Sequence, residues 1–346
     1  MTHSFSTIVN MKNNTEWIVA LLAAKKRFAI PIMTHPGIDL IGKTVNEAVT
    51  SGEIHFQAID ALNKKYPAAA ATMIMDLTVE AEAFGSRIIL PLHEVPSVLE
   101  RIVYDEETVD ALKVPDLKAG RIQQYLLAAS LASQNIIDKP VFAGCIGPIS
   151  LAGRLYDMTE LMTALFIEPE VIKKLLEKCT EFIIKYIRAF KDTGVKGIII
   201  AEPAAGLLSE DMCDEFSSEY IRQIVSLLQD ETFMVILHNC GNKGHLTRSM
   251  VSTGAQGLHF GNAVNIIEAL AEIPSGIIAM GNLDPVNVFK MMDPGQLYHT
   301  TTELLQKTRR YNNFVISSGC DTPPNVPIAN IDAFYQAITD FNKSQN

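Results

Sequence analysis

Val235-Ile236-Leu237-His238-Asn239-Cys240-Gly241-Asn242 is a short apolar run that ends in two metal-ligand side chains and a glycine turn. Side chains of an extended chain alternate between two faces, so His238 and Cys240 point to the same side. An apolar run without strict alternation is typical of a parallel strand buried on both faces. The stretch therefore predicts a buried parallel strand with two potential ligands at its carboxyl end.

Other stretches of the chain have the same character. They are short and apolar, and a helical pattern follows most of them, as expected for β/α units. They centre near residues 30, 73, 143, 199, 258, 278 and 316. Together with the strand at His238 they predict eight parallel strands, which would close into a (β/α)₈ or TIM barrel, an α/β fold. An open doubly wound sheet is the alternative, but no Gly-x-Gly-x-x-Gly motif follows an early strand.

Helical patterns separate these strands. The clearest is Pro169–Asp192, in which apolar residues recur at intervals of three and four and lysines occupy the other face. Cys179 belongs to its apolar stripe and is interpreted as a core residue. Further helices are predicted from about Thr15 and over residues 44–65, 121–134, 209–229, 265–271, 293–309 and 330–342. His35-Pro36-Gly37 predicts a loop, and residues 86–115 predict an irregular excursion.

The composition is that of a globular protein with a sizeable core. Of the 346 residues, 48% are hydrophobic and 20% are charged. A barrel of this class routinely exceeds about 200 residues as one unit. We therefore expect residues 1–14 to form a loose leader and residues 15–346 to form a single (β/α)₈ barrel domain with an N-terminal helical extension.

Charge and cysteine content limit the partners and the compartment. The formal net charge is −10, and no run of Lys or Arg exceeds three residues, which argues against nucleic acid and membrane surfaces as partners. Five cysteines make a disulfide framework unexpected and favour a reducing compartment. No signal peptide or long apolar segment is recognisable. These features predict a cytoplasmic protein.

A third potential ligand follows the last predicted strand. It is Cys320, in Phe314-Val315-Ile316-Ser317-Ser318-Gly319-Cys320-Asp321. With His238 and Cys240 it would give three protein ligands and one open position, which is the pattern of catalytic zinc. The alternative is that all three are ordinary buried residues, since free Cys is often a small core hydrophobe. The His-x-Cys spacing alone leaves both interpretations open.

Further polar residues fall at or just beyond the carboxyl ends of predicted strands. They are Asp76, Glu202, His259 and Asp284. In a TIM barrel this end of the strands is the catalytic face. The pattern therefore predicts a site assembled from several strands.

Three longer segments resemble one known family. They are Met75-Asp76-Leu77-Thr78-Val79-Glu80-Ala81-Glu82-Ala83-Phe84-Gly85, Gly281-Asn282-Leu283-Asp284-Pro285 and Ser318-Gly319-Cys320-Asp321-Thr322-Pro323-Pro324. The chain is similar to the uroporphyrinogen decarboxylase family from about Glu16 to Phe341. Asp284 lies in a segment shared across the family, so we interpret it as structural or general to the fold.

The family contains decarboxylases, and this chain departs from their pattern. They have paired arginines in the first loop, an acid after the second strand, a tyrosine after a Gly-x-Pro turn and a histidine after the last strand. The first loop here, residues 33–39, has no arginine, and Arg154 and Cys320 occupy the tyrosine and histidine positions. Only the acid, Asp76, is kept. A porphyrinogen with many carboxylates requires cationic side chains, so decarboxylation is the runner-up.

The other branch contains the methylcobamide:thiol methyltransferases, which include coenzyme M methyltransferases. Their zinc pattern, His-x-Cys followed much later by Cys, corresponds to His238, Cys240 and Cys320. The resemblance implies zinc-dependent transfer of a methyl group from a methylcobamide to a small thiol such as coenzyme M. Because the chain has no Asp-x-His-x-x-Gly motif, a separate corrinoid protein would supply the cobamide.

The remaining site residues have two interpretations each. Glu202 is expected to be a fourth ligand or a base for the thiol proton, or else a carboxylate held by loop hydrogen bonds. Asp76 and His259 are expected to line the pocket, Asp76 with a catalytic and His259 with a substrate-binding role, or else to be structural. Arg154 would bind an anionic group of the acceptor, or form a surface salt bridge. A non-catalytic corrinoid- or tetrapyrrole-binding barrel is the third possible function.

Overall fold

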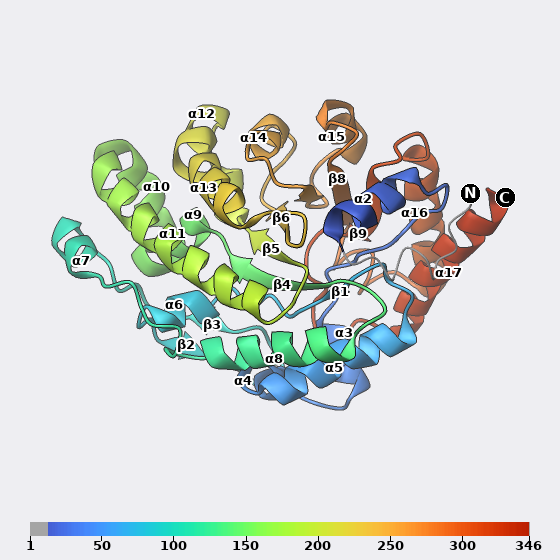
Figure 1. Ribbon diagram of the computed structural model, residues 1–346, viewed down its shortest axis with the longest axis horizontal. Helices are drawn as coiled ribbons and strands as arrows, with labels where there is room; N and C mark the ends of the chain where they lie inside the picture. The colour runs from blue at the N-terminus through green and yellow to red at the C-terminus, as the bar shows by residue number, and fades with distance from the viewer. Residues whose placement is uncertain (1–12, 346) are drawn as a thin grey trace.

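The computed structural model describes residues 13–345, and the predicted leader falls mostly on residues 1–12, outside them. Within the described part, seven parallel strands form one curved sheet in the order β1-β4-β5-β6-β7-β8-β9, and helices cover its outside (Figure 1). Their bounds are β1 Ala71–Thr72, β4 Val141–Ile146, β5 Gly197–Ala201, β6 Met234–Asn239, β7 Gly257–Phe260, β8 Ile278–Leu283 and β9 Phe314–Ser318. The predicted α/β class, with a parallel sheet of the TIM-barrel type, is confirmed, but the sheet has seven strands in the described residues where eight were predicted, and the N-terminal helical extension stays a prediction.

The predicted strand near residue 30 is present only as an extended segment with a single parallel bridge, Ala29 to Ile316. The Ile30 amide donates to the Ile316 carbonyl at 3.1 Å, and the Ala69 amide donates to the Ala29 carbonyl at 2.9 Å. The segment therefore contacts β9 on one side and the residues that precede β1 on the other. Pro31 lacks an amide hydrogen, which limits a regular ladder here.

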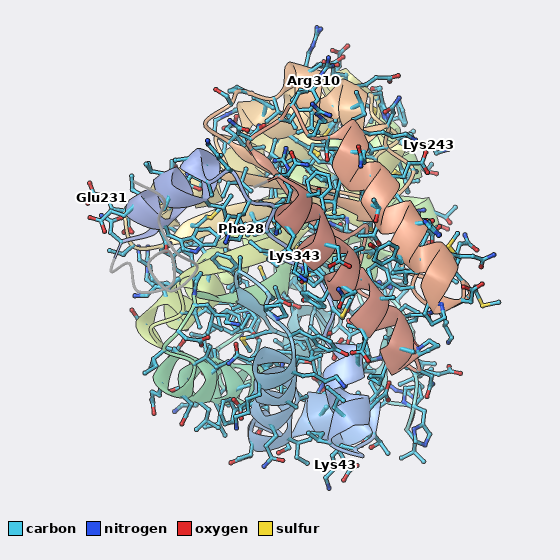
Figure 2. The ribbon with its side chains drawn as sticks, turned by 90° about the vertical axis from the view of Figure 1, so that its right-hand side faces the viewer. Phe28, Lys43, Glu231, Lys243, Arg310 and Lys343 are labelled. Carbon is cyan, nitrogen blue, oxygen red and sulfur yellow. The ribbon has the colours of Figure 1, made fainter. Side chains whose placement is uncertain are left out.

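Four of the described helices, α2 to α5, precede β1, and the others lie between or after the strands. The helices are α2 Asn14–Ala23, α3 His35–Leu40, α4 Val45–Thr50, α5 Gly52–Lys65, α6 Val79–Ala83, α7 Glu106–Ala111, α8 Ile122–Asn135, α9 Pro148–Tyr156, α10 Met158–Ile167, α11 Pro169–Asp192, α12 Glu210–Cys213, α13 Glu219–Leu228, α14 Thr247–Ser252, α15 Ile266–Glu272, α16 Pro294–Lys307 and α17 Ile328–Ser344. Short 3₁₀ and π segments, η1 Pro203–Leu207 and η2 Asp214–Ser218, precede and follow α12. Figure 2 shows α16 and α17 lying side by side.

Two layers of apolar side chains hold the sheet. The larger layer lies between the strands and the helices and includes the buried stripe of α11 with Cys179. The smaller layer lies on the inner face of the sheet and includes Met234 and Ile236 of β6. Trp17 of α2 packs edge-on against Phe142 of β4, with ring centroids 5.8 Å apart. Because β6 alternates with a period of two, the inner series that begins at Met234 and Ile236 continues to His238.

Several local predictions were wrong. His35-Pro36-Gly37 is not a loop but opens helix α3, with Pro36 in the first turn, where its missing amide hydrogen costs nothing. The helix predicted over 44–65 is two helices, because Ser51 adopts an extended conformation and caps α5. Residues 86–115 contain an antiparallel pair, β2 Ile88–Ile89 with β3 Ser97–Val98, and helix α7. No helix among residues 13–345 is long and apolar enough to cross a membrane.

Candidate metal centre

Strand β6 and the turn after it position the first two predicted ligands. His238 is the fifth residue of β6, and Cys240 follows the last one. Gly241 permits the turn, since a Cβ there would lie 2.3 Å from the Pro203 carbonyl oxygen. Gly261, after β7, similarly lets the backbone pass Cys240, because a Cβ there would lie 2.7 Å from the Cys240 Cα. Close backbone approach at both places brings the strand ends together.

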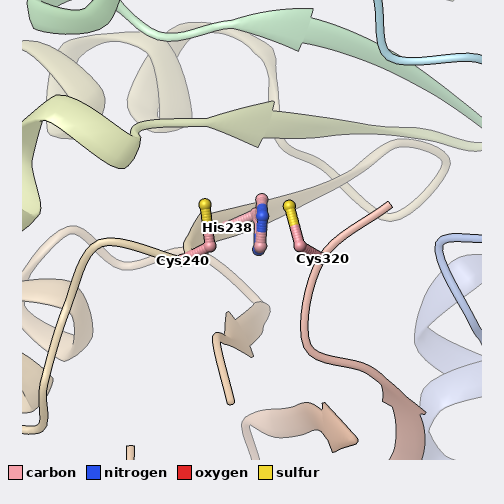
Figure 3. Close-up of side chains that lie close together, drawn as sticks. All are labelled: His238, Cys240 and Cys320. Atoms are coloured by element: carbon pink, nitrogen blue, oxygen red, sulfur yellow. The ribbon is translucent and has the colours of Figure 1, made fainter. Parts of the chain in front are cut away.

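The three predicted ligands form one cluster. The ligand atoms of His238, Cys240 and Cys320 all lie within 4.8 Å of one another. Figure 3 shows the two cysteine sulfurs flanking the His238 ring, with Cys320 arriving on the chain that leaves β9. Residues 80 positions apart in the sequence thus meet because β6 and β9 end on the same side of the sheet. This is the arrangement that the strand-end pattern predicts.

A second histidine, His259, contacts the Nδ1 side of the His238 ring. Nδ1 of His238 lies 2.8 Å from Nδ1 of His259, its register partner on β7. Nε2 of His238 is buried and has no hydrogen-bond partner among the described residues 13–345. A buried polar atom without a partner is costly unless something binds it. Nε2 is therefore the nitrogen available to a metal ion.

The two thiols interact with each other. A hydrogen bond with Cys320 lowers the pKa of Cys240, and the same bond raises the pKa of Cys320, which the His238 ring partly opposes. Both cysteines are partly exposed. One imidazole and two thiols form a donor set that suits zinc, with Zn–S bonds of about 2.3 Å and Zn–N bonds of about 2.0 Å. The residues fit a zinc ion with one open position.

His259 itself is fully buried. Its Nε2 lies 2.8 Å from the Ser317 hydroxyl, so both ring nitrogens have partners. Burial, and then the neighbouring His238 ring, hold the pKa of His259 well below its ordinary value. These contacts favour a positioning role for His259 over the predicted contact with substrate.

Glu202 lies at the end of β5, one residue beyond the register partner of His238. Its Oε1 accepts from the Ile149 amide at 3.0 Å, and its Oε2 accepts from the Ser150 amide at 3.0 Å and the Ser150 hydroxyl at 2.6 Å. Both oxygens thus cap the amino end of α9, where the helix dipole favours a carboxylate. Burial nevertheless raises the pKa of Glu202 to about 7. The geometry favours the loop-held carboxylate over a metal ligand or a free base.

Asp76 is held by a buried cation. Its Oδ2 lies 2.5 Å from Nη1 of Arg121 and accepts from the Tyr125 hydroxyl at 3.2 Å. Its Oδ1 accepts from the amide and the hydroxyl of Thr78. Arg121 also binds Glu82 at 2.7 Å. Asp76 is therefore an ionic anchor as well as a residue at the cleft described next.

A cleft of about 660 Å³ lies beside the segment that follows Cys320, although none of the three candidate ligands lines it. Asp76 and Arg154 line it, together with Asp321, the residue after Cys320. Arg154 makes no salt bridge with any of the described residues, although burial lowers its pKa and the nearby charge of Asp76 raises it. An unpaired guanidinium in a cleft is suited to a carboxylate, sulfonate or phosphate. Arg154 therefore lies where an anionic ligand group can be bound.

His35, for which the sequence suggests no role, fastens the Cys320 loop. Its Nδ1 lies 3.0 Å from the Thr322 carbonyl oxygen and 3.5 Å from an Asp321 carboxylate oxygen. Burial lowers the pKa of His35, but Asp321, the Thr322 carbonyl and Asp39 together more than offset this, so the pKa is raised. Thr34 donates its hydroxyl to Asp321 at 2.8 Å. These contacts hold the segment that bears Cys320 against the start of α3.

Sequence reasoning missed Ser317, Arg121 and the His35–Asp321 pair. Only Ser317 had a local signal, because the period of two places it on the inner face of β9 with Val315. Arg121 and Asp76 are 45 positions apart, and His35 and Asp321 are farther still, so no local pattern links either pair. Such pairings depend on which loops the fold brings together.

The fold and the site first define a class: α/β proteins of the TIM-barrel type with a His/Cys₂ cluster at the carboxyl ends of the strands. The sequence profile named uroporphyrinogen decarboxylase (URO-D) matches residues 27–341, and the chain belongs to this family.

Individual relatives fall in both branches. The methylcobamide:CoM methyltransferase MtbA of Methanosarcina acetivorans is 28% identical over 276 residues, which cover 79% of this chain and 80% of the relative. A uroporphyrinogen decarboxylase of Neisseria meningitidis is 27% identical over 240 residues, covering 65% and 66%. A solved structure described as a methyltransferase from Methanosarcina mazei covers 98% of this chain and 99% of its own, with a TM-score of 0.85 and 22% identity. That likeness establishes the fold.

Proposed function

We propose that this protein is a zinc-dependent methyltransferase that moves a methyl group from a methylated corrinoid, held on a separate protein, to a small thiol such as coenzyme M. One observation supports the proposal most directly. His238, Cys240 and Cys320 place three ligand atoms within 4.8 Å of one another, and the imidazole Nε2 has no hydrogen-bond partner in the part of the chain that the structure describes. The similarity to the methylcobamide:CoM methyltransferase MtbA supports it.

The chemistry of this donor set suits thiol activation. Zinc lowers the pKa of a coordinated thiol, so that the sulfur is bound as a thiolate near neutral pH. His238, Cys240 and Cys320 would hold the ion and leave one position for the acceptor. Two cysteine thiolates balance its charge, which leaves an added thiolate electron-rich and nucleophilic.

The transfer itself balances without an external redox partner. The acceptor sulfur forms a bond to the methyl carbon while the cobalt–carbon bond breaks, and the electron pair of that bond stays on cobalt as Co(I). The thiol proton passes to solvent when the thiolate forms. The cleft next to Cys320 would take the rest of the acceptor, with Arg154 binding an anionic group on it. The corrinoid would arrive on a partner protein at the same face.

The test is the metal content of purified protein, compared with Cys240→Ser, Cys320→Ser and the control Cys213→Ser. Cys213 is buried and lies outside the cluster. The expected result is about one zinc per chain in the wild type and the control, and loss of zinc in both ligand variants. A wild type that folds but binds no zinc contradicts the proposal. Demethylation of methylcobalamin with 2-mercaptoethanesulfonate then measures the transfer.

A decarboxylase is the second candidate, and one observation favours it: Asp76, the acid of the decarboxylase pattern, lines the cleft. That carboxylate is already paired with Arg121, however, and the cleft offers no paired arginines. A decarboxylase of this type would release CO₂ from a porphyrinogen and keep its activity after chelation of metal. Binding of corrinoid or tetrapyrrole without turnover of either kind would instead indicate the non-catalytic binding protein.

A further inference from the structure

Three side chains on three strands form a hydrogen-bonded row next to the proposed metal site. Nδ1 of His238 on β6 lies 2.8 Å from Nδ1 of His259 on β7, and Nε2 of His259 lies 2.8 Å from the Ser317 hydroxyl on β9. Their relative exposures are 1%, 0% and 0%, so water cannot replace any of these contacts. This row of side chains runs across the inner face of the sheet.

The ring hydrogens of two neutral histidines can be placed in two ways along this hydrogen-bonded row. Only one hydrogen can lie between two nitrogens 2.8 Å apart, so one Nδ1 donates and the other accepts. If His238 donates, its Nε2 has a free lone pair, and His259 donates from Nε2 to Ser317. If His259 donates, the proton of His238 is on Nε2, and that atom is blocked for a cation. The buried Nε2–H would then lack a hydrogen-bond partner among residues 13–345.

We propose that His259 is a positioning residue that selects the first arrangement. It accepts the Nδ1 proton of His238 and donates its own Nε2 proton to Ser317, and so presents the lone pair of His238 Nε2 to the metal. This inference rests on the metal site of the proposed function. A metal-bound histidine commonly donates its other ring hydrogen to a carboxylate, a carbonyl or water, which fixes its tautomer and orientation. Here a buried imidazole takes that place.

The backbone enforces the pairing. His238 and His259 are register partners on neighbouring parallel strands. The two Nδ1 atoms are 2.8 Å apart, so the N–H of His238 lies within hydrogen-bond distance of the lone pair of His259. The rings are nearly perpendicular, at 78° with centroids 4.6 Å apart. A residue at position 259 therefore needs an acceptor atom at the place of Nδ1. Asparagine can supply one with its amide oxygen, whereas phenylalanine fills the volume without an acceptor.

The experiment compares zinc affinity by competition with a chelator in His259→Phe, His259→Asn and Ser317→Ala. The expected loss is about 10- to 100-fold for His259→Phe. The expected loss is smaller for Ser317→Ala, and His259→Asn is expected to restore most of the affinity. His55→Phe is the control, because His55 is also buried but lies away from the cluster and accepts from the Ile74 amide. Wild-type affinity in His259→Phe, or an equal loss in His259→Asn or His55→Phe, overturns the proposal.

A second measurement does not depend on zinc, on the reaction or on substitution. Ring ¹⁵N chemical shifts of metal-free wild-type protein report which nitrogen of His238 bears hydrogen. The expected result is a protonated Nδ1 and a bare Nε2. A protonated Nε2 with a bare Nδ1 overturns the positioning role. If the wild type binds no zinc, the proposed function fails, while these shifts still decide how His259 orients His238.

Discussion

Nη1 of Arg121 lies 2.5 Å from Oδ2 of Asp76, in an ion pair whose side chains are 8% and 1% exposed. The pair joins the start of α8 to the segment after β1 and so fixes one wall of the cleft. Arg121 has a second carboxylate partner in Glu82. Asp76 has no second cation within salt-bridge distance in the described part of the chain. Removal of Arg121 therefore leaves Asp76 without a cation, whereas removal of Asp76 leaves Arg121 paired with Glu82.

We predict that Arg121→Met lowers the free energy of unfolding by about 3–5 kcal/mol, because it leaves Asp76 charged and buried without its cation. Asp76→Asn should cost less, since Arg121 keeps Glu82. Urea denaturation measures both. The control Arg87→Met removes an exposed pair with Glu100 and should cost less than ~1 kcal/mol. Equal losses at positions 121 and 87 would show that the buried pair contributes little.

Arg154 is predicted to set the preference for an anionic acceptor. Arg154→Met should raise KM for 2-mercaptoethanesulfonate about 10- to 100-fold, because a charge-assisted hydrogen bond contributes about 1.5–3 kcal/mol. The value of kcat should change little if this contact is equally strong in the ground state and the transition state. Steady-state kinetics with methylcobalamin as donor measures both constants.

The neutral thiol 2-mercaptoethanol is the matched control for this prediction. It should react equally well with the wild type and Arg154→Met, since it has no charge for the guanidinium to bind. Arg154→Lys should recover part of the affinity for the sulfonate, because it restores charge without the planar fork. A KM increase of the same size for both thiols would assign Arg154 to the shape of the cleft instead.

Glu202→Gln separates a helix-capping role from a metal-binding one. The substitution puts an NH₂ group where one of the carboxylate oxygens accepts from α9, so two donors would face each other. The free energy of unfolding should fall by about 1–3 kcal/mol, while zinc content stays near one per chain. Calorimetry and metal analysis test the two parts. Loss of zinc from a well-folded variant would instead make Glu202 the fourth ligand.

The sequence was sufficient for seven of the eight predicted strands and for the clustering of the three candidate ligands. Apolar runs that end in polar residues predict both the parallel strands and the side of the sheet where those residues gather, as His238, Cys240 and Cys320 illustrate. The prediction was weakest where the backbone departs from regular pairing. Pro31 interrupts one expected strand, and only Ala71–Thr72 of the next one pairs regularly.

Side-chain partners were harder to predict than strands. A period of two says which face His259 occupies, but its contact with His238 requires the register of β6 on β7. That register is set by packing along both strands and not by the residues around either histidine. Because the sequence does not show that His238 and Ser317 bind the two nitrogens of His259, a contact of His259 with substrate was expected instead.

Glu80 gives the chain a predicted pH dependence of stability. Its side chain is buried in α6, with Oε1 accepting from the Ile146 amide at 3.1 Å and Oε2 without a partner among the described residues. Burial raises the pKa of Glu80 from 4.5 to about 8. Between these values the folded protein keeps a proton that the unfolded chain has released. The free energy of unfolding therefore falls as pH rises from 4.5 to about 8, by up to ~5 kcal/mol from Glu80. Above this range Glu80 adds no further change.

Glu80→Gln removes this titration and keeps an acceptor for the Ile146 amide. The variant and the wild type should have similar unfolding free energies near pH 4.5, and the variant should become the more stable one as pH rises to 8. Urea denaturation across this range measures the difference. Glu107→Gln, at an exposed position of α7, should follow the wild type at every pH. A difference between Glu80→Gln and the wild type that does not change with pH would mean that folding leaves the pKa of Glu80 unshifted, because only a proton bound differently by the two states gives the slope.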